Sequence, residues 1–337
     1  MKVLISGSFW HGSLEESYAR AFEANGWNVE RFDWDKRAHE HRLGGTVVTE
    51  RMLRNKTANE IGKEFVEVLA TVLPDLIFVI KGNTIGRKTL ESARHTLPDC
   101  LFINFNPDSP WDHPNRSSRF LESIPYYDAH FIWNRQLSEK FMAAGATRAE
   151  YLPFAYDPIL HYPIGSVITE RLADAVFVGT YSKERDRLLG SLEGLDIQIV
   201  GNGWDRAKRV PKKWIASDAL YGTDALRVLA NGACAINILR PQNEGSHNMR
   251  TFEIPAAARP MLTTRSSEQA EWLLEGKEME CYDTPEELFL KIKQLAEDHD
   301  YAESLARNGN ERLKSETYEK RARQIVEVLG FSGGGGA

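Results

Sequence analysis

The sequence predicts an α/β fold made of two Rossmann-like domains, each built on a parallel sheet. Short apolar segments recur along the chain and alternate with segments of helical period, which is the pattern of parallel βαβ units. The alternation is interrupted by a stretch with three prolines at residues 153–172 and then restarts. A chain of 337 residues also has the length of about two domains.

The N-terminal half contains the first set of predicted strands. They are the segments 2–7, 28–33, 76–80, 101–105 and 130–133. A helix is expected directly after the first strand, because Ser13 is followed by Leu-Glu-Glu in a capping-box pattern. We assign residues 1–162 to this N-terminal domain.

The C-terminal half repeats the alternation. Its predicted strands are 175–179, 196–201, 233–239 and 260–264, and helices are expected near 218–230 and 249–258. The segment 285–329 is rich in Glu, Lys, Arg and Ala and is predicted to be helical. We assign residues 163–330 to the second domain and the glycine-rich residues 331–337 to a flexible tail.

Composition and charge indicate an ordinary globular protein without a nucleic-acid partner. The formal net charge of −6 gives no electrostatic reason to expect binding to nucleic acid. The three cysteines, Cys100, Cys234 and Cys281, form no CxxC pair, so neither a disulfide framework nor a zinc cluster is predicted. No apolar run has the length of a signal peptide core or a membrane span. We therefore expect a cytoplasmic protein without a transmembrane segment.

The stretch GSHNMRTFE, residues 245–253, has an unusual set of polar groups between two apolar segments. It follows a predicted strand and begins a predicted helix, with Ser246 or Asn248 as the N-cap. The N–H groups at such a helix start favour a phosphate. Arg240, His247 and Arg250 would add donors at the same end.

Glu253 lies one turn further into the same predicted helix. A carboxylate there would repel a phosphate, but it could accept hydrogen bonds from a ribose diol. The alternative explanation is a surface ion pair with Arg250 at i,i+3, which stabilises by roughly 0.2–0.5 kcal/mol. Pro255 is expected to kink or shorten the helix, because it removes a backbone hydrogen bond.

Other loops after predicted strands carry further candidate donor-binding residues, since ligands of parallel sheets sit at the carboxyl ends of the strands. These candidates are Gly179, Thr180, Arg185, Gly203, Trp204 and Tyr221. Glycine would let a diphosphate or sugar approach the backbone, and an aromatic ring could cover a base. The alternatives are an ordinary strand-to-helix turn, a solvated helix face at Arg185 and core packing of Trp204.

The N-terminal half offers two candidates for a general base, His11 and Asp108. Histidine suits proton transfer near neutral pH, although a loop histidine is commonly structural or solvated. Asp108 lies between prolines, where an Asx turn is the alternative explanation. Four further residues are candidates for an acceptor-side cleft, namely Gly7, Ser8, Lys81 and Asn83.

Several short motifs follow one another in a specific order along nearly the whole chain. They are IKG (80–82), NPDSPW (106–111), GATRAEYLPFAYDP (145–158), FVGT with a following ER pair (177–185), GNGW (201–204), NILR (237–240), NMRTFEIPA (248–256) and TYEKRA (317–322). Together they resemble the CgeB-like glycosyltransferases, which are related to the group-1 glycosyltransferases of the GT-B fold. The resemblance implies two Rossmann-like domains with sheets facing an interdomain cleft. It also implies a nucleotide-sugar in the C-terminal half and an acceptor in the N-terminal half.

The resemblance also assigns roles to the 245–253 stretch. It implies that Glu253 holds the ribose hydroxyls, and it places a set of residues near the diphosphate. This set comprises Arg240, His247, Asn248, Met249, Arg250 and Thr251. The family pattern has seven residues between two glutamates, whereas eight residues separate Glu244 from Glu253, so the role of Glu244 is in doubt.

The expected reaction is transfer of a sugar from a UDP- or GDP-sugar to an acceptor hydroxyl on a glycan, glycolipid, protein or small molecule. Arginines and helix N–H groups can stabilise the departing diphosphate, so no obligatory metal or other cofactor is expected.

The sequence leaves four alternative functions open. An NAD-dependent oxidoreductase would use the first strand and Asp33, but the loop has only Gly7 and Gly12 and lacks GxGxxG. A metal-dependent GT-A transferase would use the DWD motif at 33–35. A GT-B-fold sugar-nucleotide epimerase or hydrolase would share the donor site, and a coat or assembly protein would keep the fold without turnover.

Overall fold

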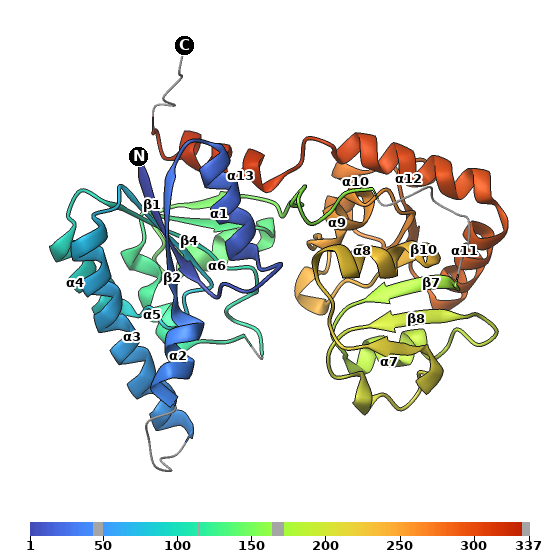
Figure 1. Ribbon diagram of the computed structural model, residues 1–337, viewed down its shortest axis with the longest axis horizontal. Helices are drawn as coiled ribbons and strands as arrows, with labels where there is room; N and C mark the ends of the chain where they lie inside the picture. Colours follow the sequence, from blue (N-terminus) through green and yellow to red (C-terminus); the bar gives the residue numbers. More distant parts are fainter. Residues whose placement is uncertain (43–49, 114, 164–171, 332–337) are drawn as a thin grey trace. The chain divides into compact units, whose positions relative to one another are not determined.

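The computed structural model describes residues 1–42, 50–113, 115–163 and 172–331. Within these residues the chain forms two compact units. Unit 1 comprises Met1–Pro153 and the segment from Tyr318 onward, and unit 2 comprises Phe154–Thr317. Each unit contains its own six-stranded sheet, visible in Figure 1.

The sheet of unit 1 has the order β2-β1-β3-β4-β5-β6, and all its strand pairs are parallel. Its strands are β1 (Lys2–Gly7), β2 (Asn28–Asp33), β3 (Leu76–Ile80), β4 (Leu101–Phe105), β5 (Ala129–Ile132) and β6 (Ala149–Tyr151). The helices of unit 1 are α1 (Leu14–Ala24), α2 (Trp34–Arg42), α3 (Glu50–Val72), α4 (Arg87–Thr96), α5 (Ser118–Ser123), α6 (Ser138–Ala143) and α13 (Tyr318–Val328), with the short η1 (Ile124–Tyr126) and η2 (Arg135–Leu137). The Ser13 hydroxyl accepts a hydrogen bond from the Glu16 N–H, which confirms the predicted cap of α1.

The sheet of unit 2 has the order β12-β11-β10-β7-β8-β9 and is also parallel. Its strands are β7 (Ala173–Val178), β8 (Ile197–Val200), β9 (Ile215–Ser217), β10 (Gly232–Asn237), β11 (Met261–Thr264) and β12 (Glu280–Tyr282). Its helices are α7 (Lys183–Leu189), α8 (Gly222–Ala230), α9 (Arg250–Ala256), α10 (Ser267–Trp272), α11 (Pro285–Glu297) and α12 (His299–Leu313), with η3 (Trp204–Arg206), η4 (Lys212–Trp214) and η5 (Pro241–Asn243). The predicted fold class, two parallel α/β sheets, is confirmed. Among the described residues, no helix is long and apolar enough to cross a membrane.

The strands β6, β9 and β12 were not predicted from the sequence. Each has only three residues and lies at an edge of its sheet. An edge strand pairs on one side only, so a short segment with little apolar character can adopt it. A run of three residues carries too little periodicity to be recognised in the sequence.

The order of strands creates a switch point in each sheet. In unit 1 the chain leaves β1 toward β2 on one side and returns to β3 on the other. In unit 2 it proceeds from β7 to β9 on one side and from β10 to β12 on the other. Ligands of open α/β sheets bind beyond the carboxyl ends of the strands at such points. The relevant loops therefore follow β1 and β3 in unit 1, and β7 and β10 in unit 2.

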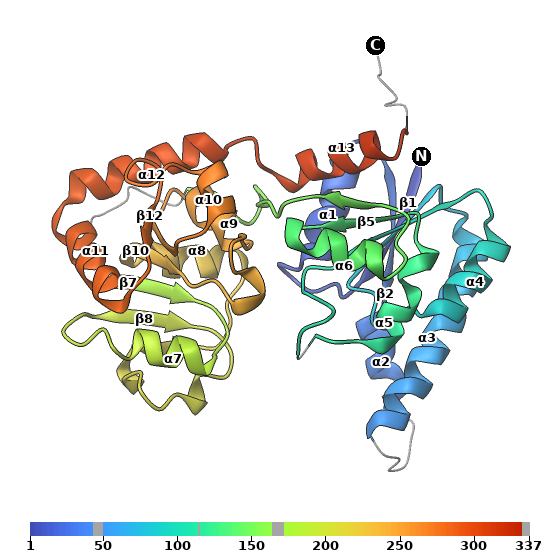
Figure 2. The ribbon, with the colours of Figure 1, turned by 180° about the vertical axis from the view of Figure 1, so that it is seen from behind.

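The last helix, α13, belongs to unit 1 and lies beside α1 (Figures 1 and 2). The rings of Tyr318 and Tyr18 are 5.0 Å apart, and Asn25 Nδ2 donates to the Glu319 carbonyl at 3.1 Å. From the sequence, this helix is assigned to the C-terminal domain, because no local pattern indicates that the chain returns to the first unit at its end.

The unit boundary also differs from the predicted one at residue 162. Residues from Phe154 onward already belong to unit 2, where Tyr156 forms a bridge with Thr317. Most of the second half of the predicted linker, 164–171, and the tail residues 332–337 lie outside the described residues.

Candidate functional site

The loops after β7 and β10 are joined by one buried arginine, Arg185 of α7. Its Nη1 donates to the Thr180 carbonyl and its Nη2 to the Ile238 carbonyl, both at 2.9 Å. The residue is only 8% exposed, so the predicted alternative of a solvated helix face is wrong. Arg185 holds the two loops of the switch point together.

The glycines of the β7 and β8 loops allow a close approach between backbones. Gly201 has a φ of +151°, and a Cβ atom there would lie 2.1 Å from the Gly179 carbonyl oxygen. The same carbonyl accepts a hydrogen bond from Trp204 Nε1 at 2.8 Å. Gly203 adopts a left-handed φ of +82° directly before Trp204, and Thr180 is exposed at the end of the loop.

Trp204 is a core residue and not a wall of a ligand pocket. Its side chain is 1% exposed and packs edge-on against the rings of Phe177 and Tyr181. Of the two predicted explanations, core packing is the one the structure supports. Trp204 therefore stabilises the glycine loop from the core side, through its hydrogen bond to Gly179.

We expect Gly201→Ala to lower the free energy of unfolding by about 2–4 kcal/mol, because overlap with the Gly179 carbonyl adds to the cost of a positive φ. Gly194→Ala is the matched control. Gly194 also has a positive φ of +88°, but no atom lies within 4 Å of its added Cβ. Its loss should be about 1 kcal/mol, the backbone cost alone. Urea denaturation of both variants measures the difference, and equal losses would contradict the steric explanation.

The start of α9 is held by a polar network under the 245–253 stretch. Asn248 exchanges two side-chain hydrogen bonds with Asn237 of β10, at 3.1 and 2.8 Å. Asn248 Oδ1 also accepts from the Thr251 N–H at 3.2 Å, as a helix cap does. Gln269 Oε1 accepts from the Thr251 hydroxyl at 2.9 Å and from Thr263 at 3.0 Å. These bonds fix the direction in which the first N–H groups of α9 point.

His247 is a structural residue, which corrects its predicted role as a phosphate donor. Its side chain is 0% exposed. Nε2 accepts a hydrogen bond from the Phe154 N–H at 3.1 Å, and Nδ1 lies 2.9 Å from Glu268 Oε2. Both ring nitrogens are therefore occupied inside the unit. Ser246 also bonds to Glu268, so the first half of the stretch anchors α9 and α10.

Glu253 is buried, with 4% of its surface exposed. Its Oε2 is bonded to Arg250 Nη1, so the predicted i,i+3 pair exists but is not a surface pair. Arg250 Nε also donates to the Val178 carbonyl at 3.4 Å, which brings α9 to the end of β7. Pro255 lies one residue before the helix ends at Ala256, which confirms that the helix is short.

Three arginines give this switch point a positive charge. Burial, together with the neighbouring charges of Arg240 and Arg250, lowers the pKa of Arg185 to about 10. Arg240 is exposed and, within the part of the chain that the structure describes, has no carboxylate partner. The N–H groups of Met249 and Arg250 have no backbone acceptor among the described residues. Cations and amides grouped in this way suit an anion.

The structure adds His161 to the candidate site. In the sequence, this residue lies in the predicted linker, 153–172. Its Nε2 lies 3.6 Å from Glu253 Oε1. Next to it, the Tyr162 hydroxyl lies 3.3 Å from Thr223 Oγ1 at the start of α8. The predicted base-stacking residue Tyr221 immediately precedes α8 and is 41% exposed. The only available signal in the sequence was the position of His161 three residues after the end of the YDP motif of the resemblance.

In unit 1 the predicted acceptor residues lie in the loops after β1, β3 and β4. Lys81 Nζ lies 3.3 Å from Asp108 Oδ2, so the loops after β3 and β4 are paired. Lys81 has a left-handed φ of +68°. Asn83 Oδ1 is buried and has no hydrogen-bond partner among the described residues. His11 is exposed in the loop after β1.

Glu15 of α1 is a buried carboxylate that sequence reading missed in this region. Its Oε1 accepts a hydrogen bond from the Ser8 N–H at 3.1 Å, and a Cβ at Gly7 would lie 2.1 Å from its Cγ. Burial raises the pKa of Glu15. The glycine at position 7 is therefore required for this side chain to fit under the loop. The sequence instead predicts Gly7 to line an acceptor cleft.

The DWD motif at 33–35 is a helix cap. Asp33 Oδ1 accepts hydrogen bonds from the N–H groups of Asp35 and Lys36, both at 3.0 Å. Asp35 Oδ2 accepts from the Ser8 hydroxyl at 3.2 Å. Both the GT-A alternative and the NAD alternative required a free carboxylate here, so neither gains support.

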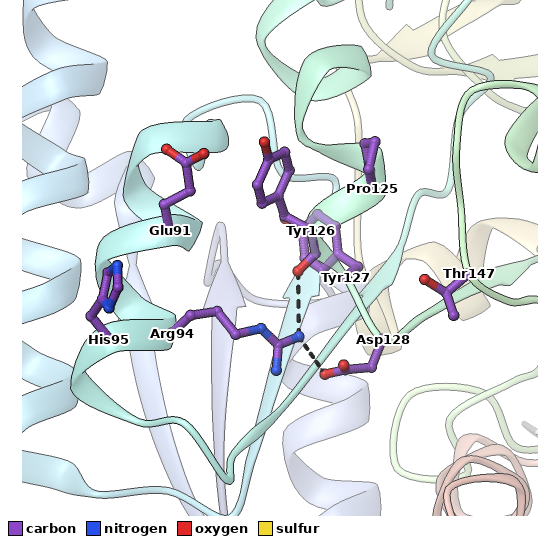
Figure 3. A pocket seen from close by; sticks show the side chains of 8 residues that line it. All are labelled: Glu91, Arg94, His95, Pro125, Tyr126, Tyr127, Asp128 and Thr147. Atoms are coloured by element: carbon purple, nitrogen blue, oxygen red, sulfur yellow. Dashed lines mark hydrogen bonds and ion pairs between the residues drawn. The ribbon is translucent and has the colours of Figure 1, made fainter.

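Each unit has a pocket among its described residues. A pocket of about 440 Å³ in unit 1 is lined by Glu91, Arg94, His95, Pro125, Tyr126, Tyr127, Asp128 and Thr147 (Figure 3). Arg94 points to Asp128, with a distance of 2.7 Å between Nη2 and Oδ2. Asp128 precedes β5, so this pocket lies at the amino edge of the sheet, opposite the predicted residues.

The second pocket, of about 530 Å³, lies at the carboxyl edge of the unit 2 sheet. Glu244, Gly245 and Arg265 contribute to its lining. Arg265 is paired with Glu275 and with Asp283, whose Oδ2 is 2.8 Å from its Nε. Its charge is therefore balanced, in contrast to that of Arg240.

Comparison with known proteins finds a family similarity in the C-terminal part of the chain. Residues 185–327 match the family model described as "Glycosyl transferase-like". This match covers most of unit 2 and continues into α13 of unit 1. No curated protein matches the sequence.

Solved structures match over nearly the whole chain. Sucrose-phosphate synthase of Thermosynechococcus elongatus has a TM-score of 0.70 at 11% identity, covering 97% of this chain and 98% of its own. Anabaena HepE in complex with UDP-glucose has a TM-score of 0.65 at 14% identity, covering 98% and 99%. T4 phage BGT in complex with UDP-glucose has a TM-score of 0.59 at 12% identity, covering 98% and 100%. The predicted GT-B-like fold is thus confirmed.

Proposed function

We propose that the protein is a metal-independent, CgeB-like glycosyltransferase that moves a hexose from a UDP-sugar to an acceptor hydroxyl. The observation that carries this proposal is the combination of three arginines and one buried carboxylate at the unit 2 switch point. The glycosyl transferase-like match of residues 185–327 covers this site. HepE and T4 phage BGT each have a structure with UDP-glucose, which supports uridine as the first base to test; guanosine is the second.

In this proposal the diphosphate lies against Arg240, Arg250 and the first N–H groups of α9. Cleavage of the bond between sugar and diphosphate leaves an additional negative charge on the departing oxygen. Fixed cations and amides stabilise that charge without having to reorganise. Arg185 shapes the site by holding the loops that carry these groups, since its own donors are used by the carbonyls of Thr180 and Ile238.

Glu253 is proposed to accept hydrogen bonds from the ribose hydroxyls, one turn away from the diphosphate. A carboxylate has about four lone-pair sites, so pairing with Arg250 leaves acceptor capacity. Tyr221 is proposed to cover the base. On the acceptor side, Asp108 or His11 is proposed as the base that removes the proton of the attacking hydroxyl. The pairing of Asp108 with Lys81 keeps the Asp108 carboxylate oriented.

Differential scanning fluorimetry in EDTA tests the proposal. UDP at a hundredfold excess over its Kd should stabilise the protein by about 2.7 kcal/mol, which raises the Tm by about 5–10 °C. GDP and NAD are measured in parallel. A response to NAD without a response to either nucleoside diphosphate would overturn the proposal in favour of an oxidoreductase.

Turnover separates the remaining alternatives. Incubation with UDP-sugars without an acceptor should leave the donor largely intact. Rapid release of free sugar or of an epimer under these conditions would favour the epimerase or hydrolase. Binding without transfer to a broad panel of acceptors would favour a non-catalytic assembly protein.

A further inference from the structure

The turn Asp157–Tyr162 is a rigid element placed against Glu253. Asp157 is 3% exposed, and its Oδ1 accepts a hydrogen bond from the Ile159 N–H at 2.9 Å. Its carbonyl accepts from the His161 N–H at 2.8 Å. Leu160 is 5% exposed and anchors the turn in the unit. The side chain of His161 is therefore presented from a fixed backbone.

The ring of His161 is oriented with Nε2 toward Glu253. Nδ1 accepts from the Asp157 N–H at 3.4 Å, so the proton of a neutral ring lies on Nε2. Nε2 is 3.6 Å from Glu253 Oε1, and the imidazole is 15% exposed. Burial lowers the pKa of His161, against the opposite effect of Glu253. A movement of about half an ångström would bring the two atoms into hydrogen-bond range.

Glu253 is thus contacted from both ends. Arg250 bonds to Oε2, and His161 faces Oε1. The next residue of the turn, Tyr162, reaches Thr223, which lies two residues after Tyr221. One short turn therefore faces the carboxylate proposed for the ribose and contacts the helix that begins after the tyrosine proposed for the base.

We propose that His161 is a positioning residue that fixes the Glu253 carboxylate to accept both ribose hydroxyls, and so makes the 2′-hydroxyl of the nucleotide a required feature. This inference rests on the proposed function. Without His161, the carboxylate is held from the Arg250 side only and can rotate about its last torsion. A rotated carboxylate still accepts one hydroxyl, but it no longer distinguishes a ribose from a 2′-deoxyribose.

Isothermal titration calorimetry with UDP and 2′-deoxy-UDP tests this, with GDP and 2′-deoxy-GDP in parallel. We expect the unmodified protein to bind the ribonucleotide at least about tenfold more tightly than the deoxynucleotide, because a hydrogen bond to a buried charge is lost. In His161→Leu this ratio should fall below about threefold, through weaker binding of the ribonucleotide. His161→Gln keeps a neutral N–H donor and should retain most of the ratio. His299→Ala, at an exposed histidine of the same unit, is the control.

Pyrophosphate binding distinguishes positioning from general damage to the site. A positioning role leaves the pyrophosphate affinity of His161→Leu unchanged within about threefold, whereas a merely structural role lowers all affinities together. If His161→Leu does not fold, His161→Ala is read in the same way. An unchanged ribose-to-deoxyribose ratio in a folded variant overturns the inference and leaves the proposed function intact. The absence of any nucleoside diphosphate binding by the unmodified protein overturns the proposed function itself.

Discussion

Replacing Glu253 with alanine should weaken UDP binding by about a hundredfold or more. Two hydrogen bonds between ribose hydroxyls and a carboxylate contribute about 1.5–3 kcal/mol each, and about 2.7 kcal/mol already corresponds to a hundredfold change in Kd. The environment favours the upper part of this range, because Glu253 is 4% exposed and water competes little. Isothermal titration calorimetry with UDP measures the effect.

The same variant should keep its affinity for pyrophosphate. Truncation of Glu253 removes a negative charge next to Arg250 and leaves Arg240 unchanged, so the electrostatic attraction for the diphosphate is at least maintained. Glu253→Gln retains one acceptor oxygen and should lose about tenfold. Glu297→Ala, at an exposed carboxylate of the same unit, serves as the control. A Glu253→Ala protein that binds UDP as tightly as the unmodified protein would contradict the ribose assignment.

The largest loss of stability is expected for Arg185→Ala. Truncation leaves the carbonyls of Thr180 and Ile238 without these donors, and the bond to Ile238 is a buried one. An unsatisfied buried polar group costs about 1–3 kcal/mol, and the packing of the buried Arg185 side chain is lost as well. The free energy of unfolding should therefore fall by about 3–4 kcal/mol. Urea denaturation followed by circular dichroism provides the measurement.

Two variants separate this explanation from a general effect of charge. Arg187→Ala removes an exposed arginine of the same helix and should change stability by less than about 0.5 kcal/mol. Arg185→Lys keeps the charge but lacks the planar fork that reaches two carbonyls at once. It should recover less than half of the loss. Full recovery by lysine would mean that the charge, and not the two hydrogen bonds, stabilises the loops.

The strands of both sheets could be predicted because each carries its signal locally. The segments Lys2–Gly7, Leu76–Ile80 and Leu101–Phe105 have the bounds that their apolar runs indicated. The edge strand Asn28–Asp33 also has its predicted bounds, although its sequence is largely polar. Strands buried on both faces are continuous apolar runs, and this pattern requires no knowledge of the partner strands. The three-residue edge strands have no such run and were missed.

The candidate site was predictable in part. Arg240, Arg250 and Glu253 are grouped within one loop and one helical turn, so their proximity follows from the sequence alone. The structure gives a different role to His247, which lies in the same stretch but is a buried support. A histidine is equally compatible with a ligand contact and with a buried hydrogen-bond pair, and Glu268, which decides between them, is 21 residues away.

The amino-acid sequence by itself determined the two-domain α/β fold, the strand ends that carry polar loops and the charged character of the 245–253 stretch. Only the tertiary structure decided that α13 returns to unit 1, that Trp204 and His247 are internal supports, and that His161 faces Glu253. The physical reason is that local patterns record how each segment meets water and its own backbone. Contacts between distant segments depend on shape and on hydrogen-bond partners, which no periodicity in the chain encodes.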